Sequence, residues 1–408
     1  MSTPFYDLAS LVLVPSGYKA QKVYAQKPLT TDGQLSFSRA STATRVNSAG
    51  LIETVSSNVP RLDYLGSSCP KLQLEPSRTN AITWSENVAS CLTSQVGTTV
   101  AADATTSPDG TANADKITFG SGNAYRLRGE TVAASTTYTF SVFIKNDTFS
   151  GSEQVFINLS DGVVGGLTAT YVPAQATITV VGSAGAWTGV SGKVENYGNG
   201  WYRVIATGTS VGGGSGWFEI ATVNTPKAAF FWGFSLEIGA YATSYIRTTT
   251  ATVTRLADVC LSATASSLFN SPSGVFYWEG NFDSNSTPPG GICVSGSFGN
   301  RVQMYNSGAD VYAIVDVASN NVFSANTTGV NITQNHKYAV SWSLNDFTFY
   351  VDGVQVASDT SGATFSSSTL NQFRFSDQST NYFYANVKKV IVFPTRLTNA
   401  QLAELTAL

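Results

Sequence analysis

The stretch Tyr241-Ala-Thr-Ser-Tyr-Ile-Arg-Thr-Thr-Thr-Ala-Thr-Val-Thr-Arg-Leu-Ala-Asp258 contains no glycine and lies between two long glycine-rich tracts. Its threonine, tyrosine, valine and isoleucine residues favour extended backbone, because β-branched and aromatic side chains fit a pleated sheet and are stiff in a helix. The stretch therefore predicts an ordered strand that joins two β-rich modules. We expect its front half, through Ile246, to finish the first module and the part from Val253 to start the second.

The composition of the chain supports an all-β protein with more than one domain. At 408 residues it is longer than a single hydrophobic core usually grows. Disorder is excluded by 42% hydrophobic and 12% aromatic residues, which supply enough apolar surface to offset chain entropy. Short β-branched and aromatic runs separated by Gly, Asn, Asp and Ser predict strands joined by tight turns.

Charge and hydropathy exclude two classes of partner. The formal net charge of -3 provides no basic field for a polyanion, so no nucleic acid partner is expected. The sequence contains no apolar run of about 18 residues, so no membrane insertion is expected. The N-terminus lacks the positive region of a signal peptide, which predicts synthesis in the cytoplasm of the cell that makes the protein.

Several strings in residues 1–80 and around residue 250 carry a resemblance. They are Phe37-Ser-Arg-Ala-Ser-Thr-Ala-Thr-Arg-Val-Asn47, Gly50-Leu-Ile-Glu53, Pro60-Arg-Leu-Asp-Tyr64, Leu72-Gln-Leu-Glu-Pro-Ser-Arg-Thr-Asn80, Leu236-Glu-Ile-Gly-Ala-Tyr-Ala-Thr-Ser-Tyr-Ile-Arg-Thr248 and Val253-Thr-Arg-Leu-Ala-Asp258. They resemble the N-terminal module of tailed-bacteriophage structural proteins and the close of the carbohydrate-binding-like sandwich in the same proteins. The resemblance implies a tail fibre, head fibre or spike component.

Three segments are predicted. Residues 1–80 hold too few strands for a core of their own and are expected to attach the chain to a particle or to sister chains, so that their deletion leaves the later modules soluble. Residues 81–250 supply strand after strand and are expected to form a jelly-roll sandwich that resembles carbohydrate-binding modules. Residues 251–408 resemble concanavalin-like and laminin-G-like lectin sandwiches.

Local signals in the last segment are specific. Asp352-Gly353 between two alternating apolar runs predicts a two-residue hairpin turn, because both residues tolerate positive φ. Near the end of the chain, Thr398 or Asn399 is expected to cap a short helix whose apolar side is Leu402 and Leu405.

Aromatic residues are the candidates for glycan binding, because flat rings stack on sugar faces without charge. Trp187 and Trp217 lie beside small residues in predicted loops, and with Tyr125 they form the candidate carbohydrate-binding set. A tryptophan in a sandwich is more often part of the core, and Trp201 and Trp232 are assigned to the core.

No catalytic residues are predicted. The one histidine, His336, starts a predicted strand, where an ordinary polar edge role is expected, and a triad would have to use it. Glu279 and Asp283 are the nearest carboxylate pair, but the tight acid pattern of lectin-fold glucanases is absent. Calcium is a weaker expectation, with Asp283, Asn285 and Asp310 as ligands, since acids and amides in turns usually serve turn geometry.

The four cysteines lack the C-x-x-C spacing of a zinc or redox motif. They are Cys69, Cys91, Cys260 and Cys293. Free buried thiols are predicted for them, and a disulfide stays open at this point.

Two hypotheses follow for function. The first is a bacteriophage virion surface spike or fibre, made in the host bacterial cytoplasm, whose sandwiches bind host or other bacterial surface glycan as a homo-oligomer, with a trimer favoured. The second is a purely structural capsid or tail decoration protein that contacts only other virion proteins. A polysaccharide-degrading tailspike is the minor alternative.

Overall fold

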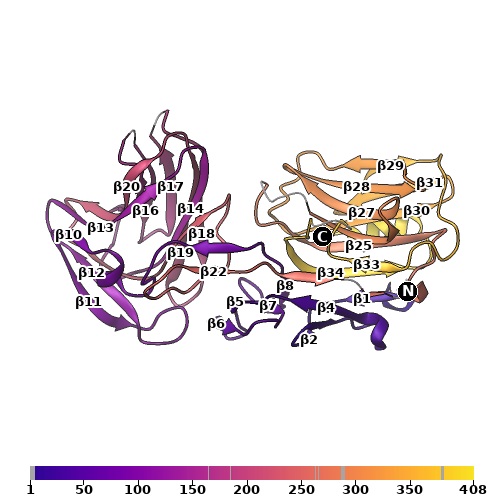
Figure 1. Cartoon of the computed structure of the whole chain (residues 1–408), viewed down its shortest axis with the longest axis horizontal. Coiled ribbons are helices and arrows are strands. Elements are labelled where there is room, and N and C mark those ends of the chain that lie inside the picture. The colour runs from indigo at the N-terminus through magenta and orange to yellow at the C-terminus, as the bar shows by residue number, and fades with distance from the viewer. Residues whose placement is uncertain are drawn as a thin grey trace.

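The computed structural model describes residues 5–163, 165–183, 185–261, 263–264, 266–285, 290–377 and 381–408. Two lobes lie side by side, and each is a sandwich of antiparallel sheets (Figure 1). The predicted all-β fold with a short C-terminal helix is confirmed. Both chain ends lie on the second lobe (Figure 1).

The first lobe pairs two six-stranded sheets among the described residues. One has the order β10 (Ser94–Val96), β13 (Asn123–Val132), β20 (Gly214–Val223), β15 (Val155–Ser160), β16 (Gly166–Val172), β17 (Thr177–Gly182). The other has the order β11 (Thr98–Thr105), β12 (Ala114–Phe119), β21 (Ala228–Ile238), β14 (Thr136–Asn146), β19 (Trp201–Ser210), β18 (Trp187–Asn196), and the short helix α2 (Val88–Cys91) precedes β10. Alternate residues of β14 and β20, such as Phe140 and Phe218, meet edge to face at 5.7 Å between ring centroids and fill the core.

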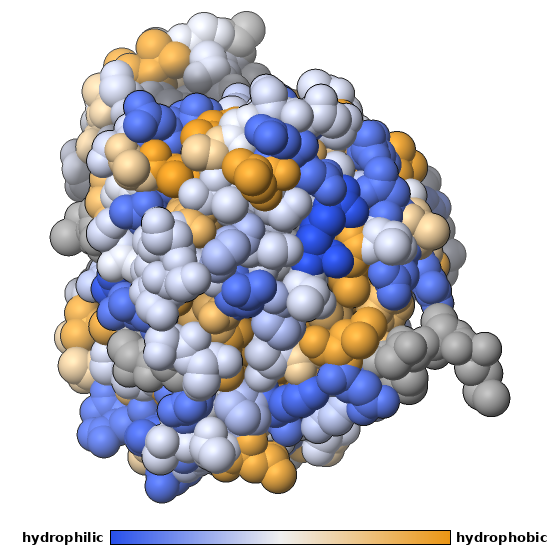
Figure 2. All heavy atoms as spheres, turned by 90° about the vertical axis from the view of Figure 1, so that its right-hand side faces the viewer, coloured by the Kyte–Doolittle hydropathy of each residue, from blue (hydrophilic) through white to orange (hydrophobic). Residues whose placement is uncertain are grey.

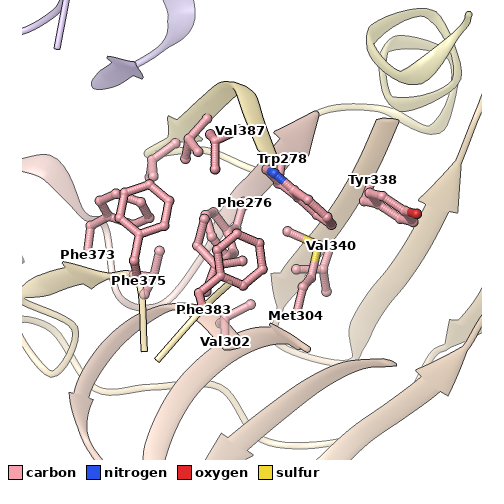
Figure 3. Packing of buried hydrophobic residues seen from close by; sticks show 14 of the residues in the cluster. Phe276, Trp278, Val302, Met304, Tyr338, Val340, Phe373, Phe375, Phe383 and Val387 are labelled. Atoms are coloured by element: carbon pink, nitrogen blue, oxygen red, sulfur yellow. The ribbon is translucent and has the colours of Figure 1, made fainter. Parts of the chain in front are cut away.

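The second lobe also packs two sheets face to face. One contains β32 (Val354–Asp359), β31 (Asp346–Val351), β30 (His336–Ser343), β25 (Gly274–Asn281), β34 (Asn386–Phe393), β8 (Lys71–Gln73) and β7 (Arg61–Asp63), with β1 (Leu11–Leu13) also on β34. The other contains β24 (Ala263–Thr264), β33 (Gln372–Arg374), β26 (Gly291–Ser297), β27 (Asn300–Ser307), β28 (Asp310–Val317) and β29 (Asn320–Asn326). Figure 3 shows the aromatic centre of this core, where Trp278 stacks on Tyr338 at 4.9 Å.

The local predictions for this lobe are confirmed. Asp352 and Gly353 have φ of 50° and 84° and join β31 to β32. Helix α3 (Asn399–Thr406) begins after Thr398, whose side chain accepts a hydrogen bond from the Gln401 backbone in a capping box. Figure 2, which faces this lobe from the side away from the first, shows polar residues interspersed with small apolar patches.

The prediction that residues 1–80 can be removed without harm to the later modules is wrong. Leu11, Leu13 and Leu72 are buried in the same core as Trp278. Short strands gain most by joining an existing sheet, and here β1 and β8 pair with β34, while β7 pairs with β8 at the sheet edge. The attachment role and the domain boundaries stay predictions.

The remaining N-terminal elements are α1 (Phe5–Leu8), β2 (Gly17–Lys19), β3 (Lys22–Tyr24), η1 (Thr31–Gly33), β4 (Gln34–Ser38), β5 (Ala43–Val46), β6 (Ile52–Val55) and β9 (Arg78–Asn80). Two of them, β4 and β9, pair with strands from later in the chain, whereas β2 pairs with β3 and β5 pairs with β6. β4 pairs with β23 (Val259–Leu261), β9 pairs with β22 (Val253–Arg255), and the turn η2 (Ser266–Leu268) follows.

The stretch 241–258 is ordered, but the prediction of a continuous strand is wrong, because only β22 within it is extended in a sheet. Side-chain hydrogen bonds hold the rest. Asn80 Nδ2 donates to the Ile246 carbonyl at 2.9 Å, and Thr248 Oγ1 donates to the Ile82 carbonyl at 2.6 Å. These contacts replace the sheet partner that this irregular segment lacks.

A buried ion cluster joins the stretch to residues 1–80. Arg39, Arg61 and Arg255 surround the carboxylates of Glu75 and Asp258, and each of the five residues is at most 1% exposed. Arg39 Nη1 lies 3.0 Å from Asp258 Oδ1, and Arg61 Nη1 lies 2.6 Å from Glu75 Oε2. Arg61 also pairs with Asp258, and Arg255 pairs with Glu75.

Further hydrogen bonds complete this ion cluster. The Ser244 backbone N–H and hydroxyl each donate to Glu75 at 2.7 Å, and the Glu75 N–H donates to Asp258 at 2.9 Å. Burial favours the neutral form of Glu75, but Arg255 and Arg61 outweigh burial and hold the pKa of this carboxyl well below its ordinary value. The conspicuous charged residues of the quoted strings therefore serve the junction between the lobes.

Candidate functional site

The candidate site lies on the solvent-facing side of the sheet that contains β13, β20 and β15. Along β20, Phe218 and Ile220 are buried in the core. Trp217 and Glu219, which alternate with them along the strand, point outward. Period-two alternation places residues of one parity on each face, and antiparallel pairing extends that face across the neighbouring strands.

Two of the three predicted aromatic residues share this face. Tyr125 on β13 is directly opposite Ala221 of β20, and Trp217 of β20 is directly opposite Gly129 of β13. The two rings are therefore four residues apart along the strands, or about 13 Å at a rise of about 3.3 Å per residue. Trp217 is 38% exposed and has Gly129 and Ser160 as its cross-strand neighbours, so small residues leave its ring open to solvent.

A third aromatic residue, Phe156 on β15, completes the face and was missed from the sequence. It is opposite Ala221, so Ala221 separates it from Tyr125 across three adjacent strands. Phe156 is only partly buried, whereas its neighbours Val155 and Ile157 are in the core. The alternation in residues 154–159 could have shown this outward position, once the inner face of the strand was known.

A polar pair lies between the rings. Asn158 Nδ2 donates to Glu219 Oε2 at 2.9 Å, and these residues are cross-strand partners. Asn158 Oδ1 has no hydrogen-bond partner among the described residues. That oxygen is buried, so the face offers flat rings at its edges and the Glu219 carboxylate at its middle, which suits a ligand with both apolar and hydroxyl-bearing surfaces.

The prediction of a sugar platform at Trp187 is wrong. This residue starts β18, is 5% exposed, and packs edge to face against Tyr138 at 6.3 Å within the core of the first sandwich. The small residues around it shape a turn that delivers the indole inward. Trp201 and Trp232 are buried, as predicted.

The predicted calcium ligands do not share partners. Asp283 accepts a hydrogen bond from Asn386 at 2.7 Å, whereas Asp310 lies on β28 and accepts one from Thr327 at 3.3 Å. Within the described ranges, no group of three or more His, Cys, Asp or Glu residues could hold a metal ion. Calcium binding through Asp283, Asn285 and Asp310 stays a prediction.

The residues considered for catalysis have ordinary partners. Glu279 accepts a hydrogen bond from the Tyr277 hydroxyl at 3.1 Å and lies 3.8 Å from Lys389. His336 begins β30 and contacts the Asp352 carboxylate at 2.5 Å. These are contacts of a sheet edge and a hairpin, and the absence of catalysis stays a prediction.

The structure also describes the state of the cysteines and the character of the helices. Cys91, Cys260 and Cys293 are free and buried, and Cys69 is free and exposed. Burial raises the pKa of the Cys91 thiol to about 12, which keeps it protonated and unreactive. Of the helices in the described part of the chain, none has the length and apolar character to span a bilayer.

Similarity to known proteins is confined to solved structures. No protein-family model matches the chain, and no curated protein matches it. The chain is similar to the Ruminococcus gnavus IT-sialidase CBM40 bound to alpha2,3 sialyllactose, with 14% sequence identity, a TM-score of 0.29, and coverage of 33% of this chain and 83% of that chain.

Two further structural matches cover more of this chain. Domains LG4-5 of the mouse laminin alpha1 chain are 10% identical with a TM-score of 0.26, and the match covers 72% of this chain and 93% of that chain. A Trypanosoma rangeli sialidase is 9% identical with a TM-score of 0.28, and the match covers 94% of this chain and 82% of that chain. The structural neighbours thus include a carbohydrate-binding module and laminin G domains, and at these TM-scores they assign neither a family nor a function to this chain.

Proposed function

We propose that this protein binds a glycan on the outer face of the β13, β20 and β15 strands. The observation that carries the proposal is the placement of Trp217 and Tyr125 on one open face, with Glu219 between them along the strand. A sugar ring presents apolar C–H groups on its faces and hydroxyls at its rim. The aromatic rings would stack on the C–H faces, and Glu219, oriented by the Asn158 amide, would accept hydrogen bonds from the hydroxyls.

The shape of the site favours an extended oligosaccharide over a single sugar. The distance of about 13 Å between the Trp217 and Tyr125 positions along the strands exceeds the width of one ring. Each stacking contact on an open sheet face is weak. A homo-oligomer, for which a trimer is our proposal, would multiply such contacts through effective concentration.

The biological setting we propose is the surface of a bacteriophage virion, where the chain acts as a spike or fibre on a bacterial surface glycan. The resemblance of the strings in residues 37–80 and 236–258 supports this setting. The buried ion cluster also supports it, because it ties residues 39–75 to the stretch 241–258 that connects the two sandwiches. A fixed arrangement suits a protein that must present binding faces in one direction.

A glycan array with the full chain tests the binding function. Replacing Trp217 by alanine should weaken binding to any recognised bacterial glycan by about 10- to 100-fold, because losing the burial of an aromatic side chain costs about 1.5–3 kcal/mol. Trp84→Ala is the matched control, since Trp84 is 39% exposed and Trp217 is 38% exposed. The control variant should bind as the wild type does.

Two results would contradict the proposal. Equal binding by the Trp217→Ala and wild-type chains would remove the site from this face. Absence of binding across bacterial surface glycans at high protein concentration would favour the purely structural role on the particle. We expect binding without cleavage, so release of reducing ends from a bound polysaccharide in proportion to the protein would support the hydrolase alternative.

A further inference from the structure

A concave region lies where the two lobes meet, on the opposite side of the first sandwich from Trp217. It encloses about 540 Å³ and is bounded by β18, β19, the stretch 240–242, and loops of the second lobe at 283–285 and 331–333. This volume falls in the range of small-ligand sites, which occur preferentially at domain interfaces. We call it the interlobe cleft.

Hydroxyl groups form the floor of the interlobe cleft. Thr137, Thr207 and Thr209 line it from β14 and β19, and Ser191 lines it from the edge strand β18. The Thr137 and Thr209 hydroxyls are hydrogen-bonded at 2.8 Å, which fixes their orientation. Each hydroxyl retains a further lone pair or proton for a ligand. The opposite wall adds Asn331, so amide and hydroxyl groups face each other across the opening.

Three charged residues line the cleft. Lys193 Nζ lies 2.9 Å from Glu195 Oε1, so this pair presents no net charge. Asp283 is the other charged residue of the lining. Burial raises the pKa of Asp283, and the positive charge of Lys71 opposes that rise. With Asp283 ionised the lining sums to −1, which disfavours an anionic ligand and leaves a neutral hydroxylated ligand as the better match to the hydroxyl and amide groups.

A smaller chamber of about 90 Å³ opens beside the cleft and shares Lys193, Glu195 and Asp283 with it. Asn386 lines this chamber and is 1% exposed. Its Nδ2 donates to Asp283 at 2.7 Å, but its Oδ1 has no hydrogen-bond partner among the described residues. The polar side chains that line the chamber suit a hydroxyl group better than an apolar one.

From these observations we propose that the interlobe cleft is a second binding site, for a neutral oligosaccharide. Hydroxyls and amides from both lobes would bind the sugar hydroxyls, and the chamber at Asn386 would accept a hydroxyl from one end of the ligand. This site is separate from the Trp217 face, because the two belong to opposite sheets of the first sandwich. Ligand bound here contacts both lobes, so it strengthens their junction.

The test uses the full chain and a panel of size-defined neutral and anionic oligosaccharides released from bacterial O-antigens and capsules. Ser191→Trp places a large side chain in the cleft from an exposed position on an edge strand. Ser358→Trp is the matched control, because Ser358 is exposed on β32, the edge strand of the second lobe. Calorimetry measures affinity, and hydrogen exchange locates the protected peptides.

We expect a neutral oligosaccharide to slow exchange in residues 187–196 and 239–245. Ser191→Trp should weaken its binding at least 10-fold, while Ser358→Trp and Trp217→Ala should leave it unchanged. The inference fails if no neutral oligosaccharide protects these peptides, if Ser191→Trp binds as the wild type does, or if only anionic members of the panel bind. If only Trp217→Ala loses binding, the neutral oligosaccharide binds the outer sheet face, and the proposal of a second site in the interlobe cleft is wrong.

Discussion

Replacing Glu75 by glutamine should destabilise the protein strongly, because this carboxylate lies between Arg61 and Arg255 in the buried ion cluster. The substitution keeps the shape of the side chain but leaves Arg61 with Asp258 as its carboxylate partner and removes the carboxylate that pairs with Arg255. Removing one partner of a buried pair costs about 3–5 kcal/mol. For a cooperative unit of about 150–250 residues, that loss corresponds to a fall in Tm of about 6–20 °C.

The pH dependence provides a second measurement of the same group. The pKa of Glu75 is lowered in the folded state, so its contribution to stability is complete above the unfolded pKa of about 4.3 and is lost as the pH falls through the folded pKa. The difference in unfolding free energy between wild type and Glu75→Gln should be constant from pH 5 to 7. It should begin to shrink below about pH 4.

Urea unfolding followed by fluorescence measures both effects, and Glu53→Gln is the control. Glu53 pairs with Arg45 at 2.6 Å, but its side chain is 36% exposed, so its loss should cost about 0–1 kcal/mol. If Glu75→Gln and Glu53→Gln unfold at the same urea concentration, the buried ion cluster does not hold the junction together. A difference between wild type and Glu75→Gln that grows in acid would refute the assignment of charge to Glu75.

Four other perturbations follow from the structure. Deleting residues 1–80 should give insoluble protein, since it strips strands from the second sandwich, and a soluble, cooperatively folding remainder would contradict this. Trp187→Ala should lower the free energy of unfolding by about 3–5 kcal/mol, because Trp187 is buried. Trp217→Ala should change it by less than about 1 kcal/mol, because Trp217 is exposed. Equal urea midpoints for the two variants would refute this difference. Thr398→Ala should cost about 1 kcal/mol through loss of the cap of α3, which a thermal melt detects. Trypsin should spare native Arg247 despite its exposed side chain, because the backbone around it is hydrogen-bonded, and mass spectrometry of the fragments would reveal cleavage there.

Features that depend on neighbouring residues were predictable. The Asp352-Gly353 turn needs only two residues that tolerate positive φ, and the start of α3 needs only the Thr398 side chain and the backbone three residues later. Alternation within single strands likewise indicated the all-β fold. For the site, alternation could place Trp217 on one face of a strand but could not say which face is the core.

The partners of each segment came from the tertiary structure. The motif residues Arg39, Glu75, Arg255 and Asp258 looked like a family signature. Their common role became visible only in the fold, which pairs Glu75 with Arg255 across 180 positions and Arg39 with Asp258 across 219. Trp187 is buried because Tyr138 from another strand covers it, and no local pattern records that contact.

The amino-acid sequence by itself determined an all-β chain with tight turns, a capped C-terminal helix, and aromatic residues at positions such as Trp217 and Tyr125. Strand propensity, turn chemistry and helix capping act over a few residues, so they can be recognised locally. Only the tertiary structure decided that β1, β7 and β8 complete the second sandwich, that Trp217 and Tyr125 share an open face, and that a polar cleft lies between the lobes. Strand pairing and burial depend on contacts between distant segments, and their energies appear only when those segments meet.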